Sequence, residues 1–173
     1  MEILESPYPR ADWSSFTSAL SIARTTQDRA SFQGLDFSFL CFTGFNLHEV
    51  DFSGCDLRHC IFSSVNLSNA NLSNSNLSSA NLANARLDRV NLTNANLNAA
   101  VLTLARSNLS GSYFSGCDFS GRDFTDANLT DVNLTNGNLT NSNFANANLT
   151  NTNFIGTRLD GAILTLAGAK LER

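Results

Sequence analysis

The apolar residues of this chain recur at every fifth position over most of its length. Each fifth residue from Phe32 to Leu102 is Leu or Phe, and the same step meets only Leu or Phe from Leu109 to Leu164. Between the two runs the phase moves by two residues. An α-helix repeats about every 3.6 residues and a β-strand every two, so neither element alone explains this spacing.

The residues around each apolar centre indicate a chain that turns every five residues. A small or apolar residue usually lies two positions before the centre, Asn or Asp lies one position before it, and two small or polar residues follow. Asn, Asp, Ser and Gly tolerate turn conformations, and four such turns close a coil of about 20 residues that can stack with parallel pairing. We therefore predict an all-β solenoid whose core includes the repeat centres Leu67, Leu72, Leu77, Leu82, Leu129 and Leu134.

The repeating units also resemble those of a known family. Ala70–Asn74 (ANLSN) and Ala127–Asp131 (ANLTD) are similar to the A(D/N)LXX signature of the pentapeptide-repeat family, and comparable units cover about residues 30–166. The resemblance, which is nearest to small stand-alone cyanobacterial members, implies a right-handed quadrilateral parallel β-helix of about seven coils. It implies little about function, because the signature residues form the core and the turns.

Two nearly identical segments interrupt the five-residue step. AVLTLARSNL (residues 100–109) and AILTLAGAKL (residues 162–171) each separate successive leucines by seven residues, which suggests an internal duplication or two repeat proteins joined end to end. We divide the chain, as one continuous domain, into an N-terminal segment with a capping helix (1–29), a first repeat block (30–102), a phase slip with a bulge (103–108), a second block (109–166) and a C-terminal tail (167–173).

Both ends of a solenoid need a cover, because an open coil exposes unpaired backbone and core side chains. At the N-terminal end we predict a short α-helix over about residues 12–25, capped by Asp12, with its apolar face formed by Trp13, Phe16, Leu20 and Ala23. A helix that binds a partner or a membrane is the alternative. At the C-terminal end, Ile163, Leu166 and Leu171 either fold over the last core layer or pair with the same end of a second subunit in a homodimer.

The charge of the chain disfavours some classes of function. With 11 basic and 15 acidic residues the net charge is −4. Proteins that bind nucleic acid or anionic membranes directly need clusters of Lys and Arg, and the sequence has none. The N-terminus carries Glu2 and Glu5 and lacks the long apolar run of a signal peptide, so we expect a cytoplasmic protein.

The sequence contains no recognisable catalytic or metal-binding motif. His48 and His59 fall two units apart, which places them on opposite sides of a coil where they cannot share a metal ion or a substrate. The cysteines occupy one outward position and three inward positions, namely Cys41 and then Cys55, Cys60 and Cys117. We expect no disulfide, no metal and no cofactor, and we do not expect an enzyme.

One inward position carries a charge. Arg122 lies two residues before Phe124, where the other units have uncharged residues. Its long stem lets the guanidinium reach solvent or one of the carboxylates of Asp118, Asp123 and Asp126. A ligand site at Arg122 is the alternative.

These features favour a non-catalytic rod that binds a protein partner, whose identity the sequence does not show. Some pentapeptide-repeat proteins mimic DNA and bind DNA gyrase, and for this alternative the candidate partner surface is Asp36, Asp51, Asp56, Asp118 and Asp123. Duplex DNA as long as the rod, about 32 Å, carries roughly 19 phosphates, whereas residues 30–173 have a net charge of only −3. A scaffold that assembles end to end with copies of itself is the third possibility.

Overall fold

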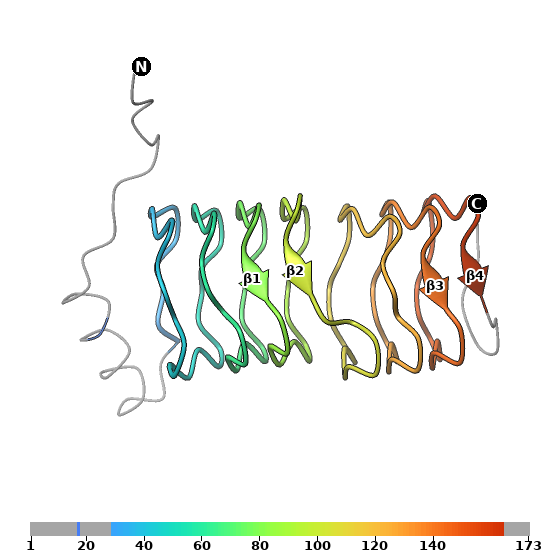
Figure 1. Ribbon diagram of the computed structural model, residues 1–173, viewed down its shortest axis with the longest axis horizontal. Helices are drawn as coiled ribbons and strands as arrows, with labels where there is room; N and C mark the ends of the chain where they lie inside the picture. The colour runs from blue at the N-terminus through green and yellow to red at the C-terminus, as the bar shows by residue number, and fades with distance from the viewer. Residues whose placement is uncertain (1–16, 18–28, 165–173) are drawn as a thin grey trace, which may run out of the picture.

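The computed structural model describes Thr17 and residues 29–164, and residues 29–164 form a parallel β-helix (Figure 1). Every bridge joins a residue to its counterpart one coil later, 20 positions along the chain, except that Asn91 pairs with Tyr113. The bridges form four ladders, which run along the axis of the coil. The predicted all-β parallel solenoid is therefore confirmed.

Each ladder defines one wall of the coil. Wall 1 begins with the bridge of Ser31, wall 2 with that of Asp36, wall 3 with that of Cys41 and wall 4 with that of Asn46. Successive ladder residues along the chain are five positions apart, except for the seven from Val101 to Asn108, so one coil contributes one residue to each ladder. The four-sided cross-section follows directly from the five-residue period of the sequence.

The short strands of the described region lie on wall 3. They are β1 (Asn81–Leu82), β2 (Val101–Leu102), β3 (Asn143–Phe144) and β4 (Ile163–Leu164). β1 pairs in parallel with β2, and β3 pairs in parallel with β4, with the first residue of each strand opposite the first residue of its partner. Figure 1 shows all four strands on one side of the rod.

The apolar centres of the units fill the interior of the coil. The repeat centres Leu67, Leu72, Leu77, Leu82, Leu129 and Leu134 are each at most 1% exposed. Centres one coil apart stack: the ring centroids of Phe42 and Phe62 lie 4.7 Å apart with an interplanar angle of 1°, and those of Phe124 and Phe144 lie 4.7 Å apart at 5°. Because adjacent strands are spaced by about 4.8 Å, the core consists of continuous columns of side chains.

The polar residues of each unit build its turn. The corner residue two positions after a centre has a positive φ, as at Asn74 (57°) and Gly54 (67°), a conformation that Gly and Asn adopt at low cost. The Asn before the centre supports the same turn, since Asn71 Oδ1 accepts a hydrogen bond from the N–H of Ser73 at 3.2 Å. The amide of Asn91 donates to Asn71 Oδ1 from the next coil at 3.1 Å, so these amides hold the backbone and each other.

The phase slip lengthens wall 3 by two residues. Leu104 is only 2% exposed, and its carbonyl accepts the turn hydrogen bond from the N–H of Ser107 at 3.2 Å, so Leu104 takes the central core position after Leu102. The N–H of Arg106 then donates to the carbonyl of Thr125, which restores the usual separation of 19 residues between donor and acceptor. Leu104 thus continues the wall inward, because burying an apolar side chain is favourable, and this differs from the outward bulge predicted for residues 103–108.

The predicted covers at the two ends lie largely outside the described residues. This holds for the helix over about residues 12–25, of which only Thr17 is described, and for Leu166 and Leu171. Ile163 is described and lies on wall 3, where it occupies in β4 the position that Val101 occupies in β2. The two similar segments of the sequence therefore begin on the same wall.

Truncation of a core ring tests the packing of the columns. Phe52 is 0% exposed, and its ring centroid lies 5.2 Å from that of Phe37 and 5.7 Å from that of Phe42. We expect Phe52→Ala to lower the free energy of unfolding by about 3–5 kcal/mol through lost burial and the cavity left behind, as measured by urea denaturation. Ser63→Ala, on the outer surface, should change it by less than about 0.5 kcal/mol. Equal effects of the two substitutions would contradict a closely packed core.

Candidate interaction surface

The carboxylates predicted to form a partner surface differ in burial. Asp36 and Asp56 are each 1% exposed and Asp51 is 8% exposed, whereas Asp118 and Asp123 are exposed. Asp118 and Asp123 lie on walls 2 and 3 of the second repeat block, several coils from the buried group. Asp36, Asp56 and Asp118 share wall 2, with Asp51 and Asp123 on the neighbouring walls 1 and 3, but the difference in burial and the distance between the two groups leave no continuous acidic face.

Local hydrogen bonds occupy the buried carboxylates. Asp36 Oδ1 accepts from the N–H of Ser38 at 2.8 Å. Arg58 donates to Asp56 with two nitrogens, from Nε to Oδ1 at 2.9 Å and from Nη2 to Oδ2 at 2.6 Å. Such a two-fold charge-assisted pair is strong and neutralises the carboxylate. A partner would have to break these bonds to reach either group.

Hydrogen bonds also keep Asp51 and the two exposed carboxylates ionised. Burial raises the pKa of Asp51, but the N–H of Ser53 and other donors outweigh it, so the pKa lies below its usual value. Asp118 follows the same pattern, and the hydroxyl of Thr125 is the main cause of the lowered pKa of Asp123. A lowered pKa in the folded state stabilises the fold above the unfolded value of about 3.9, and this contribution is lost as the pH falls through the folded value. These carboxylates therefore support the turns at neutral pH.

Exposed apolar side chains gather on wall 3. Six large hydrophobic residues of the described region are exposed, and four of them lie on wall 3 or at the corner before it: Phe39 (68%), Ile61 (41%), Val101 (53%) and Ile163 (59%). The other two are Tyr113 and Ile155, on wall 1 and its flank. Figure 1 marks wall 3 by its strands, and Val101 and Ile163 begin β2 and β4. Most ladder positions hold Asn or Asp, so these apolar residues depart from the repeat.

Phe39 places an exposed aromatic ring at a corner whose backbone has the positive φ of the other corners. Its φ is 65°, a region that a bulky residue adopts only at a cost. Its ring stacks on that of His59, one coil later, with centroids 4.6 Å apart and an interplanar angle of 12°. Phe39, Ile61 and Val101 are not among the surface residues predicted from the sequence. They could have been found there, because each is an aromatic or branched apolar residue at a position where most other units have Gly, Ser, Asn or Asp.

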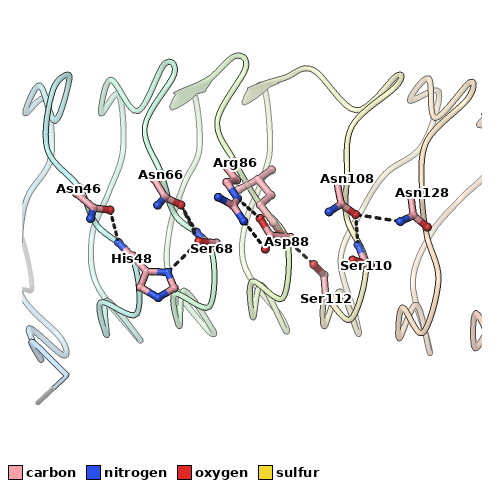
Figure 2. Close-up of polar contacts among 11 residues, drawn as sticks. Asn46, His48, Asn66, Ser68, Arg86, Asp88, Asn108, Ser110, Ser112 and Asn128 are labelled. Carbon is pink, nitrogen blue, oxygen red and sulfur yellow. Dashed lines mark hydrogen bonds and ion pairs between the residues drawn. The ribbon is translucent and has the colours of Figure 1, made fainter. Parts of the chain in front are cut away.

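Wall 4 carries a track of polar side chains that bond to one another (Figure 2). His48 Nδ1 lies 2.9 Å from the hydroxyl of Ser68, which itself donates to Asn66 Oδ1 at 2.7 Å. Arg86 Nε forms an ion pair with Asp88 at 2.5 Å. These contacts use the polar groups to brace the wall and leave it nearly neutral.

The structure places the two histidines on different sides of the rod. His48 belongs to wall 4, whereas His59 lies at the corner after wall 2. Within residues 29–164, no group of three or more His, Cys, Asp and Glu side chains is arranged to hold a metal ion. In the same region, every buried side-chain nitrogen and oxygen has a hydrogen-bond partner, so no buried polar group there points to a bound ligand.

Three of the four thiols lie inside the coil. Cys55, Cys60 and Cys117 donate to the backbone carbonyls of residues 32, 37 and 92 at 2.9, 3.0 and 2.9 Å. Burial raises the pKa of Cys55 to about 11 and the pKa of Cys60 and of Cys117 to about 12. Cys41 is exposed, and its contact with the hydroxyl of Thr43 lowers its pKa. All four thiols are free.

Comparison with protein families gives two matches that overlap by a few residues along the chain. A model of pentapeptide repeats in eight copies matches residues 66–103, and a model of the pentapeptide repeat region matches residues 100–164. Together they cover more than half of the 173 residues. A search of the curated proteins finds no match to this chain. Among the described residues, no helix is long and apolar enough to cross a membrane.

Several solved structures are similar to this chain. HetL, a pentapeptide repeat protein involved in heterocyst differentiation regulation in the cyanobacterium Nostoc, is 22% identical, with 77% of this chain and 73% of HetL covered and a TM-score of 0.47. A pentapeptide repeat protein from the thylakoid lumen of Arabidopsis thaliana is 24% identical, with 73% and 68% covered and a TM-score of 0.40. QnrB1, a plasmid-mediated fluoroquinolone resistance protein, is 20% identical, with 82% and 80% covered and a TM-score of 0.38.

The thiols give a direct test of which side chains face inward. Because the thiolate is the reactive form, Cys55, Cys60 and Cys117 should be inert at neutral pH, while the exposed Cys41 should react. We expect a chromogenic disulfide reagent to titrate one thiol in the native chain and four in denaturant. Cys41→Ser should leave no fast-reacting thiol. Rapid reaction of two or more thiols in the native state would contradict the inward placement.

Proposed function

This chain belongs to the pentapeptide-repeat family, and from that premise we propose that it is a non-catalytic rod that binds a protein partner through wall 3. The observation that carries the proposal is the gathering of four of the six exposed large hydrophobic residues on that wall or at its corner. Exposed apolar groups that depart from an otherwise polar surface mark sites of protein contact. Phe39 adds an exposed aromatic ring at a corner where most other units have Gly, Ser or Asn.

The remainder of the described surface supports a binding role over a catalytic one. Its Asn, Ser and Thr side chains hold the turns and the neighbouring coils, and its two histidines lie on different walls. Catalysis by an acid and a base requires such groups to converge within hydrogen-bond reach of one substrate. The four free thiols agree with a reducing compartment, and we place the protein in the cytoplasm on that basis.

Substitutions on two opposite walls test the assignment. We expect the variant Ile61→Ser, Val101→Ser, Ile163→Ser to lose capture of a partner from cells of the source organism by about tenfold or more, since central apolar contacts supply most of the binding energy. The matched control is Tyr113→Ser, Ile155→Ser, which removes exposed apolar groups from the wall 1 side. Quantitative mass spectrometry of the captured proteins compares the variants. Equal capture by the wild type and both variants would refute the role of wall 3.

Binding to DNA gyrase as a DNA mimic is the first alternative. Only Asp118 and Asp123 of the five candidate carboxylates are exposed. The net charge of −4 is also far less negative than that of a DNA duplex of equal length. We therefore rank this role below binding through wall 3. Under the wall 3 proposal, micromolar protein leaves gyrase supercoiling unchanged, with or without a fluoroquinolone; inhibition or protection would favour the mimic instead.

Self-association through the C-terminal end is the second alternative. Ile163 is 59% exposed in the last described coil, and β4 pairs only with β3 among the described residues. A homodimer at this end would cover Ile163, with Leu166 and Leu171 as the further candidate contacts. Sedimentation velocity separates this role from a monomeric rod, and a doubled mass that Ile163→Ser abolishes would support it.

A further inference from the structure

The phase slip interrupts most of the hydrogen bonding between two neighbouring coils. Around this junction, residues 22 positions apart occupy equivalent places, and of the four such ladder pairs only Asn91 and Tyr113, on wall 1, form a bridge. No bridge joins Asn96 to Asp118 on wall 2 or Val101 to Asp123 on wall 3. On wall 4 no bridge joins Arg86 to its counterpart in the next coil, residue 108. Backbone pairing between the two stacks of coils is thus confined to a single wall. Side-chain hydrogen bonds from Ser112 to the carbonyl of Leu87 and from Cys117 to that of Leu92 add to it at the two ends of that wall.

The backbone hydrogen bonds across the junction agree with the bridges. They are confined to wall 1 and its two corners: Arg89 N–H to Ser110 O at 3.0 Å, Leu92 N–H to Tyr113 O at 2.7 Å, Asn94 N–H to Ser115 O at 2.8 Å and Tyr113 N–H to Val90 O at 2.9 Å. One coil earlier, Leu77 and Ser79 donate to the carbonyls of Asn96 and Asn98 at 2.9 and 2.8 Å. Their counterparts Leu97 and Ala99 make no such backbone bond to the next coil.

Hollows flank the interruption on both sides of wall 3. One, of about 400 Å³, is lined by residues of wall 2 that include Leu97 and Ala99, and by Arg122 at the start of wall 3. The other, of about 430 Å³, includes Arg86 and Asn108 of wall 4. In Figure 2, Asn108 is joined to Asn128 in its own stack, but no contact joins it to Arg86 across the junction. Water can enter both hollows and hydrate the unpaired backbone groups, which makes separation of the coils there inexpensive.

Arg122 closes the junction on the wall opposite the intact ladder. Its Nη2 donates to the carbonyl of Ala100 at 3.0 Å. At the equivalent position one coil earlier, the carbonyl of Ala80 accepts from the backbone N–H of Val101 at 2.9 Å. The guanidinium therefore replaces a ladder hydrogen bond that the slip removes from Asp123. This contact accounts for a charge at an inward position. The charge of Arg122 also contributes to the lowered pKa of Asp118, one of the carboxylates within its expected reach.

We propose that this junction is a hinge in the rod, with wall 1 as the hinge line and the Arg122–Ala100 hydrogen bond as the latch on wall 3. In a solenoid each coil contacts only its neighbours, so a weak interface lets two rigid stacks move as separate bodies. The intact bonds of wall 1 keep the stacks attached while wall 3 opens and closes. The hinge is independent of the proposed partner, because it follows from backbone pairing alone.

Distances between spin labels on wall 3 test the hinge in the full-length chain. The cysteine pair Ala83→Cys, Ala145→Cys spans three coil steps across the junction and is placed in a Cys41→Ser background, which removes the exposed thiol. The pair formed by the native Cys41 and Val101→Cys spans three coil steps within the first stack, on the same wall. For both pairs we expect about 14 Å of backbone separation. We expect the pair across the junction to give a distance distribution about twofold broader than the other pair. Equal, narrow distributions would show a rigid junction and overturn the hinge.

Substitution of Arg122 tests the latch. We expect Arg122→Ala to broaden the distribution across the junction further and to leave the pair within the first stack unchanged, whereas Arg122→Lys should fall between Ala and wild type. Arg106→Ala is the matched control, since that side chain is exposed at the same junction and lies 3.6 Å from Asp126. No effect of Arg122→Ala, or an equal effect of Arg106→Ala, would overturn the latch. If Arg122→Ala fails to fold, the distance distributions of the Arg122→Lys variant and of the wild type still test the latch and the hinge.

Amide hydrogen exchange gives an independent readout of the hinge without spin labels. We expect the N–H groups of Leu97 and Ala99 to exchange about 100-fold faster than those of Leu77 and Ser79, because the first pair lacks the inter-coil bonds of the second. Arg122→Ala should also accelerate exchange at Arg89 and Asn94, the outer bonds of the hinge line, by about tenfold. Equal protection of the two wild-type pairs would contradict the interrupted ladders, and uniform acceleration along the chain would assign Arg122 a general role in stability.

Discussion

The pairing of each coil with its neighbour along the axis is the constraint on which this structure depends. A coil of 20 residues cannot satisfy its own backbone, so a donor such as Leu77 N–H must find its acceptor 19 positions later, at Asn96. The same spacing stacks the core, as in the column of Phe42 and Phe62. Backbone pairing and core packing therefore require one coil length. At the phase slip, the two added residues keep the core filled, because Leu104 is buried. They also interrupt the backbone pairing between the two neighbouring coils on three of the four walls.

The same constraint determines what the surface can offer to other molecules. The residue before each centre faces outward, yet its side chain turns back to the backbone, as Asn71 does to Ser73 and Asp36 does to Ser38. Amides and carboxylates that brace the turns are poor sites of recognition, because a partner must replace bonds that already exist. The informative surface positions are therefore those where the repeat is broken by an apolar residue, such as Val101.

The period of the sequence predicts the fold well because a single spacing controls both the turns and the core. The buried leucines, the inward thiols and the separation of the histidines follow from counting in fives. Counting does not reveal what an outward carboxylate contacts, so the burial of Asp36 and Asp56 was not foreseen. The five-residue count located the phase slip, but it did not show how the fold accommodates the two added residues. The inward position of Leu104 and the contact from Arg122 to Ala100 depend on the geometry of adjacent coils.

The departures from the repeat converge on wall 3, and this links the two proposals. The extra residues follow Val101 on that wall, the contact made by Arg122 closes the same wall, and Ile163 lies on it in the second stack. Rotation about wall 1 displaces the opposite wall more than any other part of the section, so it changes the distance between Val101 and Ile163 most. A partner that contacts both residues must therefore select one hinge angle, and its affinity is reduced by the fraction of rods that hold another angle. Because the contact from Arg122 to Ala100 favours the closed junction, it would raise the affinity of a partner that selects the closed angle and lower that of a partner that selects another, without touching either.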